Sequence, residues 1–368
     1  MIAEAPRITF VSSHATLGGS ELYLERLVAG LGPDWVREVV LLQEGPFADR
    51  LREQGVPVRV LATGRRWGLL TGALRLARAL RQTRPALVHA NGIKAALVAV
   101  LATRAVRVPI VWVKHDFSWD GRLTRLVARG CREIIGVSGA VLDGLPPRLR
   151  ARAVVIPTGI PEPVVDRDSA RALVQELAGG APVVALVGRL DPGKGQLELV
   201  EAAPHVLARL PEARFLLVGG ADPNHPAYAE QVRRRAAELG LETAVTLSGH
   251  RPDAAAVIAG CDVIALPSSA DPRGFGAEGF GLVGVEAMAS GTPVVGYAAG
   301  ALPEVLGDGA LLVAVRDRDA LAGALLDVLT RPELAAELSG RGSERYRARY
   351  RFPPMIEAMR ERYLAAAR

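Results

Sequence analysis

Two glutamates, Glu278 and Glu286, stand eight positions apart across a glycine-rich turn. A helix-like run of small residues leaves the turn and carries the second glutamate. Backbone amides at such a helix start, here at Phe280-Gly281, bind anions. A carboxylate further along can accept hydrogen bonds from a ribose diol. The pattern favours an anionic, polyhydroxylated ligand, and the alternative is an ordinary surface glutamate at 286.

A second stretch, GRLDPGKGQ at 188–196, places Arg189 and Lys194 five positions apart across a Pro-Gly turn. The turn follows a strand-like run and precedes a helix. An arginine fork and a lysine point charge at the end of a strand form a suitable clamp for a diphosphate. The spacing is not that of a P-loop. The alternative is a charged surface turn.

Two weaker motifs also follow strand-like runs. TLGGSE at 16–21 has the paired glycines Gly18 and Gly19 before a helix, which would allow close approach to a phosphate. Tight turns use the same pair, so the signal is weak. WVKHDF at 112–117 ends a strand with His115-Asp116, a pair that could do acid–base chemistry, although lone histidines are more often structural.

Strands and helices alternate throughout, which predicts parallel sheets with helices on both faces. The pattern restarts near residue 182. We therefore expect an α/β protein with two doubly wound Rossmann-like domains facing a central cleft, where ligands bind. The expected strands are 7–13, 37–43, 56–62, 86–91, 109–116, 134–138, 153–159, 182–190, 213–220, 243–249, 262–268, 292–297 and 311–315. The expected helices are 21–31, 68–83, 93–104, 121–131, 168–178, 194–209, 226–239, 253–260, 282–290, 317–329 and 341–368, the last interrupted by Pro353-Pro354.

The composition is that of an ordinary globular protein, with 49% hydrophobic and 23% charged residues among 368. The two cysteines, Cys131 and Cys261, form no CxxC pair or His/Cys cluster, so a structural metal is not expected. No signal peptide or membrane-spanning run is expected, which favours a cytoplasmic protein. The net charge is +6, but residues 1–160 carry 23 Lys+Arg against 12 Asp+Glu. A basic first half suggests anionic partners.

With these motifs in place, the chain resembles the retaining glycosyltransferases of family 4 over nearly its whole length. The strongest element is the E-x7-E pair inside EGFGLVGVEAMASGTPVVG, taken together with GRLDPGKG. The resemblance implies the two-domain B-type fold. It implies an N-terminal acceptor-binding domain at 1–165, completed by a C-terminal helix at about 350–368, and a nucleotide-sugar-binding domain at 166–349.

The resemblance also implies a role for each motif. Arg189 and Lys194 would hold the donor's diphosphate, Glu286 would hold the ribose, and Glu278 would contact the transferred sugar. The remaining positions would contact the diphosphate (Gly18, Gly19), the sugar (His115, and the amides of Phe280, Gly281 and Leu282) or the base (backbone near His250 and Arg251). The loop at 269–277 contains a second GFG copy and would lie near the donor sugar.

The implied reaction is transfer of a sugar from a UDP- or GDP-sugar to a hydroxyl acceptor, with retention. No carboxylate is convincingly placed as a nucleophile, which favours front-face attack. Two cations already serve the diphosphate and no DxD-type cluster is present, so we expect no metal or other cofactor. The alternatives are an epimerase- or phosphorylase-like enzyme of the same fold, a degenerate transferase that only binds its ligand, and a basic nucleic-acid-binding protein. The few aromatic residues, 5%, argue against the last.

The acceptor is expected to be a glycolipid, polysaccharide or natural-product intermediate bound by the first half. The expected helix at 68–83 is basic and amphipathic, with Arg75, Arg78 and Arg81. Such a helix could lie on an anionic membrane surface, which would make the protein peripheral at the inner face of the membrane. The alternative is an outer helix with solvated arginines.

Overall fold

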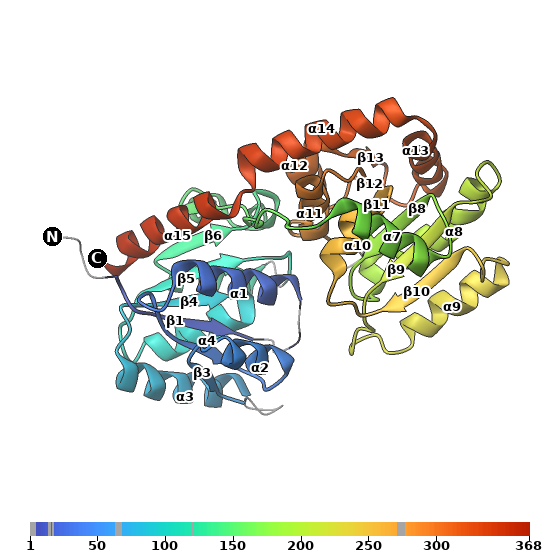
Figure 1. Ribbon diagram of the computed structural model, residues 1–368. Helices are drawn as coiled ribbons and strands as arrows, with labels where there is room; N and C mark the ends of the chain where they lie inside the picture. The colour runs from blue at the N-terminus through green and yellow to red at the C-terminus, as the bar shows by residue number, and fades with distance from the viewer. Residues whose placement is uncertain (1–4, 14–15, 17, 63–67, 119–120, 271–276) are drawn as a thin grey trace. The chain divides into compact units, whose positions relative to one another are not determined.

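The computed structural model describes the chain except for residues 1–4, 14–15, 17, 63–67, 119–120 and 271–276. The chain divides into two compact units (Figure 1). Unit 1 comprises Met1–Gly159 with Phe352–Arg368, and unit 2 comprises Ile160–Arg351. The boundaries expected from the sequence, 165 and 349, differ slightly from these because Ile160 already forms a bridge to Arg351 inside unit 2.

Unit 1 is built on a parallel sheet of seven strands in the order β3-β2-β1-β4-β5-β6-β7. The order reverses direction between β1 and β4, so the carboxyl ends of these two strands form the switch point at which ligands bind in such sheets. Strands β1, β4 and β5 are buried along their whole length, as strands covered on both faces must be. The strands are β1 (Ile8–Ser12), β2 (Val36–Leu41), β3 (Val58–Val60), β4 (Leu87–Asn91), β5 (Ile110–Lys114), β6 (Glu133–Gly136) and β7 (Ala153–Val155).

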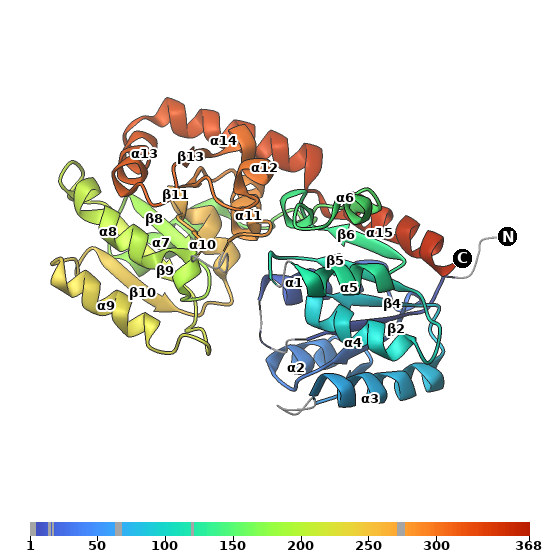
Figure 2. The same cartoon turned by 180° about the vertical axis from the view of Figure 1, so that it is seen from behind.

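Helices cover both faces of this sheet. One face carries α1 (Gly19–Leu31), α2 (Pro46–Glu53) and α15 (Phe352–Ala367) (Figure 1). The other carries α3 (Gly68–Thr83), α4 (Ile93–Thr103) and α5 (Arg122–Gly130) (Figure 2). A single turn, α6 (Pro147–Arg150), and the 3-10 turn Ala140–Leu142 precede β7. The sequence analysis did not expect α2 or α6, which are short.

The last helix of the chain, α15, packs within unit 1. The hydroxyl of Tyr363 lies 2.7 Å from Nδ1 of the buried His89 on β4. The guanidinium of Arg360 donates to the carbonyl of Leu31, which satisfies an acceptor at the carboxyl end of α1. Pro353 and Pro354 lie in the first turn of α15, where the missing N–H groups cost no helical hydrogen bond. The prolines therefore begin this helix rather than interrupt one.

Unit 2 repeats the scheme with a six-stranded parallel sheet in the order β10-β9-β8-β11-β12-β13, and its switch point lies between β8 and β11. This confirms the predicted fold class of two doubly wound α/β domains. The strands are β8 (Val183–Val187), β9 (Arg214–Val218), β10 (Val245–Gly249), β11 (Val263–Leu266), β12 (Val294–Tyr297) and β13 (Leu311–Val313). The helices are α7 (Arg167–Ala178), α8 (Gln196–Leu207), α9 (Tyr228–Glu238), α10 (Ala254–Gly260), α11 (Leu282–Ser290), α12 (Leu302–Leu306), α13 (Arg318–Thr330) and α14 (Pro332–Arg349), with 3-10 turns at Pro192–Lys194 and Gly307–Gly309.

Within the described residues, no helix combines the length and the apolar character that crossing a bilayer requires. The sequence analysis missed α12 and the first half of α14. The apolar cores lie between each sheet and its helices, as in other doubly wound folds.

The contact between α7 and α10 gives a stability prediction. A Cβ on Gly260, at the end of α10, would lie 2.2 Å from the carbonyl oxygen of Ala170, so Gly260→Ala forces the two helices apart. We expect this substitution to lower the free energy of unfolding by about 1–3 kcal/mol, measured by urea denaturation. Gly323→Ala is the matched control, because Gly323 is an exposed helical glycine with no atom near its Cβ position. It should raise stability by about 0.5–1 kcal/mol, and equal effects of the two substitutions would contradict the packing argument.

Candidate functional site

Arg189 stands just beyond the carboxyl end of β8, at the switch point of unit 2. Its guanidinium Nη1 lies 3.2 Å from Oδ2 of Asp222, which follows β9. The side chain of Asp222 is only 2% exposed, whereas that of Arg189 is 44% exposed. A buried carboxylate thus holds a guanidinium that remains open to solvent. The ion pair orients the guanidinium of Arg189 through Nη1 and leaves its solvent-exposed N–H groups available to a ligand.

Asp222 is itself well satisfied. Burial alone would raise its pKa, but the amide of Asn224, a hydrogen bond with Asp191 and the charge of Arg189 together hold the pKa below its ordinary value. Its Oδ1 accepts from the Asn224 backbone amide at 2.8 Å. The ionised form of Asp222 is therefore favoured beside Arg189.

The turn that carries Lys194 is fixed by its backbone. Asp191 accepts a hydrogen bond from the amide of Gly193 at 2.7 Å and caps the 3-10 turn. Gly195 has φ +79°, and a Cβ there would lie 2.0 Å from the carbonyl oxygen of Pro267, which follows β11. Only glycine fits this position. The loops that follow β8 and β11 therefore meet directly.

Lys194 and Glu278 form an ion pair in which Nζ lies 2.6 Å from Oε1. The hydroxyl of Ser268 donates to the same Oε1 at 3.0 Å. The side chains of Lys194 and Glu278 are 32% and 13% exposed. The backbone of Glu278 is also fixed, because its carbonyl accepts from the amide of Ala301 at 2.8 Å. The structure thus brings together two residues 84 positions apart that the sequence analysis assigned to neighbouring parts of one ligand.

The glycine turn at Gly281 precedes α11 and places the start of this helix at the same carboxyl edge of the sheet. Gly281 has φ +85°, and a Cβ there would lie 2.5 Å from Leu302, so the turn needs glycine. α11 has no side-chain cap and no acidic residue in its first turn. Among the described residues, no partner is recorded for the amides of Phe280, Gly281 and Leu282. Uncapped amides at a helix start are anion-binding donors.

Glu286 lies one turn into α11 and is half-buried. Side chains on a helix generally lean toward its N-terminus, which for Glu286 is the uncapped start of α11. Its neighbours Val285 and Ala287 are fully buried, which confirms that α11 is a packed helix. A half-buried carboxylate among buried apolar residues is suited to a ligand with several hydroxyl groups.

His250 and Arg251 follow the carboxyl end of β10. His250 is exposed, and Arg251 forms a two-point ion pair with Asp253, at 2.9 and 2.7 Å. The guanidinium of Arg251 holds the pKa of Asp253 below its ordinary value. The side chain of Arg251 is thus engaged within its own loop, which leaves the backbone of this loop as the part that could meet a ligand.

Three predicted residues lie in unit 1. Gly18 caps the start of α1 without a side-chain hydrogen bond, and Gly19 is the exposed first residue of that helix. A Cβ on Gly18 would lie 2.8 Å from Oε2 of Glu21, so the turn is closely packed. His115 follows β5. All three lie beyond the carboxyl ends of strands of the sheet.

His115 is held by Asn91, the last residue of β4. Nε2 of His115 lies 2.6 Å from Oδ1 of Asn91, and Nδ2 of the same amide donates to the carbonyl of Ser20 at 3.0 Å. The bond to Ser20 fixes which end of the amide faces the ring, so Nε2 of His115 carries the proton and Nδ1 is an acceptor. Burial lowers the pKa of His115 to about 4, against the opposing charge of Asp116 and with the help of Lys114. The ring is therefore neutral near pH 7.

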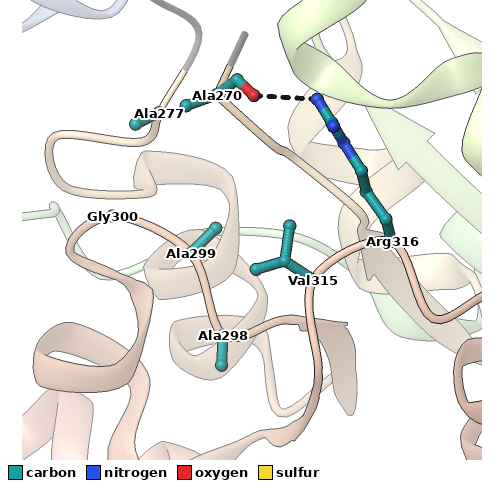
Figure 3. A pocket seen from close by; sticks show the side chains of 7 residues that line it. All are labelled: Ala270, Ala277, Ala298, Ala299, Gly300, Val315 and Arg316. Carbon is teal, nitrogen blue, oxygen red and sulfur yellow. Dashed lines mark hydrogen bonds between the residues drawn. The ribbon is translucent and has the colours of Figure 1, made fainter. Parts of the chain in front are cut away.

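Unit 2 contains a hollow of about 530 Å³ (Figure 3). It adjoins the backbone of Glu278, because Gly300, which lines it, lies directly against the Glu278 carbonyl. It lies at the carboxyl ends of β12 and β13. Its walls are small and apolar except for Arg316, whose Nη2 donates to the carbonyl of Ala270 at 3.1 Å. The lining residues are Ala270, Ala277, Ala298, Ala299, Gly300, Val315 and Arg316. The predicted sugar-proximal loop, 269–277, lies mostly outside the described residues. Of its described residues, Ala270 and Ala277 line this hollow.

One cluster in the described part of unit 2 has metal-ligand chemistry: Asp191, Asp222 and His225, whose ligand atoms lie within 4.8 Å of one another. Their oxygens already accept from protein donors, including the amide of Gly193 and the guanidinium of Arg189. We read the cluster as the support of Arg189. The expectation that no metal takes part stays a prediction.

Comparison with known proteins identifies the family. Residues 17–162 match the model described as Glycosyltransferase Family 4, and residues 172–345 match the model described as Glycosyl transferases group 1. The two matches follow one another along the chain and together take in both units. The chain belongs to the family-4 glycosyltransferases.

Two curated relatives and one solved structure illustrate the likeness. A GDP-mannose-dependent alpha-(1-6)-phosphatidylinositol monomannoside mannosyltransferase of Mycolicibacterium smegmatis is 35% identical over 49% of this chain and 49% of its own length. A D-inositol 3-phosphate glycosyltransferase of Mycolicibacterium paratuberculosis is 34% identical over 55% of this chain and 44% of its own. The chain thus spans about half the length of these relatives. The crystal structure of Anabaena HepE in complex with UDP and glucose is 26% identical, covers 97% of this chain and 99% of its own, and has a TM-score of 0.84.

In this family-4 glycosyltransferase, the predicted residues of unit 2 all follow carboxyl ends of strands or lie in the first half of α11. The sequence analysis missed three supporting side chains: Asp222, which holds Arg189, Ser268, which binds Glu278, and Asn91, which fixes His115. Asp222 and Asn91 do stand at or just beyond strand ends, which is a usable signal. What the sequence could not give is the partner of each.

The contact between Asn91 and His115 gives a second prediction. Asn91→Asp replaces a neutral acceptor by a carboxylate, which favours the imidazolium, so the pKa of His115 should rise from about 4 toward or above 6.5. The nitrogen chemical shifts of the imidazole, followed by NMR over pH 3–9, measure this change. Asn91→Leu removes the acceptor, so the Nε2–H tautomer of His115 should no longer be favoured. The pKa of His115 should not rise in this variant. The exposed His205 serves as an internal control. An unchanged His115 titration in Asn91→Asp would contradict the assignment.

Proposed function

We propose that this protein is a retaining glycosyltransferase that moves a sugar from a nucleoside-diphosphate sugar to a hydroxyl acceptor. The observation that supports it most is the cluster at the switch point of unit 2. There Arg189, Lys194 and the uncapped start of α11 offer positive charge, and Glu278 offers a carboxylate beside it. Cations with helix amides bind a diphosphate, and carboxylates bind sugar hydroxyls.

This arrangement suggests where each part of the donor binds. The diphosphate binds Arg189, Lys194 and the amides of α11, the ribose binds Glu286, and the base meets the backbone near His250. The transferred sugar lies at Glu278, beside the hollow in Figure 3. The relatives differ in nucleotide: one is named for GDP-mannose and another was solved with UDP and glucose. A uridine or a guanosine diphosphate sugar is the proposed donor.

The ion pair also favours a front-face mechanism. Glu278 shares one oxygen with Lys194 and Ser268, and a carboxylate neutralised in this way is a poor nucleophile. The bond from the sugar's anomeric carbon to the phosphate oxygen breaks, and the bond to the acceptor oxygen forms on the same face. The leaving phosphate takes the acceptor's proton. Arg189, Lys194 and the α11 amides stabilise the negative charge that grows on it, so no metal is required.

His115, in unit 1, contributes a fixed acceptor. With Nε2–H bound to Asn91, its Nδ1 lone pair is free to receive a hydrogen bond from a sugar hydroxyl. A neutral ring with a pKa of about 4 does not act as a general acid near pH 7. We therefore assign it to sugar binding rather than to proton transfer.

A panel of sugar nucleotides tests the donor site. Thermal shift and donor hydrolysis should identify one uridine or guanosine diphosphate sugar. Arg189→Gln and Lys194→Gln should each lower kcat/KM for it by about one to two orders of magnitude, since each removes a charge-assisted contact to the diphosphate. Arg234→Gln, on an exposed part of α9, is the charge-matched control and should leave kcat/KM unchanged. If no nucleotide raised the melting temperature, the proposal would fail.

The stereochemistry and the metal requirement are tested separately. Proton NMR of the first product formed should show the same anomeric configuration as the donor, and inversion would exclude the front-face mechanism. Activity should survive EDTA. Loss of activity in EDTA with recovery on added Mg²⁺ or Mn²⁺ would overturn the metal-free part of the proposal alone.

We further propose that α3 rests on an anionic membrane and brings the protein to a lipid-linked acceptor. Three leucines on this helix are exposed, Leu69, Leu70 and Leu74, at 44%, 51% and 73%. Arg78 and Arg81 are exposed on the same helix. Exposed leucines beside arginines are typical of a helix at a membrane surface.

Vesicle flotation tests this contact. The protein should float with vesicles of phosphatidylcholine mixed with phosphatidylglycerol and not with phosphatidylcholine alone. Leu70→Ser with Leu74→Ser should weaken binding about tenfold or more, because each buried leucine contributes through its apolar area. Absence of binding to the anionic vesicles would favour a soluble acceptor and leave the donor site untouched.

A further inference from the structure

Unit 1 has a cationic face that donor binding does not explain. From Gln54 to His115 the sequence contains no aspartate or glutamate and 11 lysines and arginines. Helices α3, α4 and α5 form the layer on this side of the sheet (Figure 2), and none of the three contains an acidic residue. Every side chain in the layer is therefore neutral or positive.

The arginines of this layer differ from those of unit 2 in their partners. On α9, Arg233, Arg234 and Arg235 each lie within 4.0 Å of a glutamate one turn away. At the carboxyl ends of α4 and α5, in the part of the chain that the structure describes, Arg104 and Arg129 have no recorded carboxylate partner. Solvent-exposed arginines on an ordinary protein surface usually have aspartates or glutamates nearby. A face whose helices carry arginines and no carboxylates therefore indicates an anionic partner.

A groove opens in this layer between α4 and α5. Its volume is about 270 Å³, and it is lined by Val100, Thr103, Arg104, Leu126, Arg129 and Gly130. Its floor is fixed, because a Cβ on Gly130 would lie 2.7 Å from Cγ1 of Val100 and the two helices approach closely there. Two arginines and two larger apolar residues, Val100 and Leu126, thus line one small hollow.

The lining matches one kind of ligand. Two arginines at a single groove suit a phosphate, which guanidinium groups bind through paired hydrogen bonds. Leu126 is 47% exposed at the same groove and offers an apolar surface beside the charges. Arg104 follows the end of α4 and Arg129 lies in the last turn of α5, where the helix dipole stabilises a cation. A phosphate attached to an acyl chain meets both parts of the lining.

We propose that the α4–α5 groove binds the phosphate of an anionic bilayer phospholipid, with Leu126 against the acyl region. Arg104 and Arg129 hold the phosphate, and α3 lies on the same membrane surface. The inference rests on the membrane contact proposed for α3 but concerns a separate site. The membrane contact proposed for α3 is diffuse and electrostatic, whereas the groove would bind one lipid molecule at a defined site.

A short-chain lipid tests the groove without a membrane. Dihexanoyl phosphatidylglycerol, kept below its critical micelle concentration, should bind the wild-type chain in isothermal titration calorimetry. Arg104→Gln with Arg129→Gln should abolish this binding. Arg78→Gln with Arg81→Gln removes the same charge from α3 and should change the affinity by no more than about twofold, because neither side chain lines the groove. Equal losses in the two double variants would overturn the site and leave only diffuse electrostatics.

Two further arms separate the possible failures. Inorganic phosphate should bind at least about tenfold more weakly than the short-chain lipid, since it makes no contact with Leu126. Equal affinity would overturn the lipid assignment. Circular dichroism and the donor-induced thermal shift should be unchanged in Arg104→Gln with Arg129→Gln, which shows that the variant is folded and that the donor site is intact. A wild-type chain that binds its donor but not the lipid overturns this inference alone, and one that binds the lipid but no donor overturns the proposed activity alone.

Discussion

The ion pair between Lys194 and Glu278 is the interaction on which the site of unit 2 depends. It joins the loop after β8 to the loop after β11, the two strands between which the sheet reverses its order. Both loops are pinned by backbone before the side chains meet, since Gly195 lies directly against Pro267. The cation and the carboxylate are therefore held in place by the fold, and preorganised charge of this kind is what stabilises a developing phosphate anion.

The two units differ in whether their cationic side chains have carboxylate partners. In unit 2 the cations of the candidate site have carboxylate partners, as in Arg189 with Asp222, and so do the arginines on α9. On the α3–α4–α5 layer of unit 1 acids are absent from the helices altogether. A paired cation is oriented for one ligand, whereas unpaired cations on a broad face attract any anionic surface. The first arrangement suits a small donor, and the second suits a membrane.

The sequence predicted the strands, the switch-point loops and the family, because apolar runs and glycine turns are local signals. The sequence did not predict which side chains contact one another. Arg189 and Asp222 are 33 positions apart, and Asn91 and His115 come from different strands. Those contacts depend on the order of the strands in each sheet, which no local pattern encodes. Short helices such as α2 and α12 were missed because five to eight residues carry too little periodicity to recognise.

The pairing of Lys194 with Glu278 also limits how these two residues can act. A half-buried lysine without its glutamate, or the glutamate without its lysine, would leave a partly desolvated charge unbalanced. A donor that binds both must therefore keep the pair together, with the diphosphate on one side of Nζ and the sugar on the free side of the carboxylate. Since both recorded contacts of Glu278 use Oε1, its other oxygen is the one that would face the proposed sugar. The two residues then work as a unit, and removing both should cost much less than the sum of the single losses.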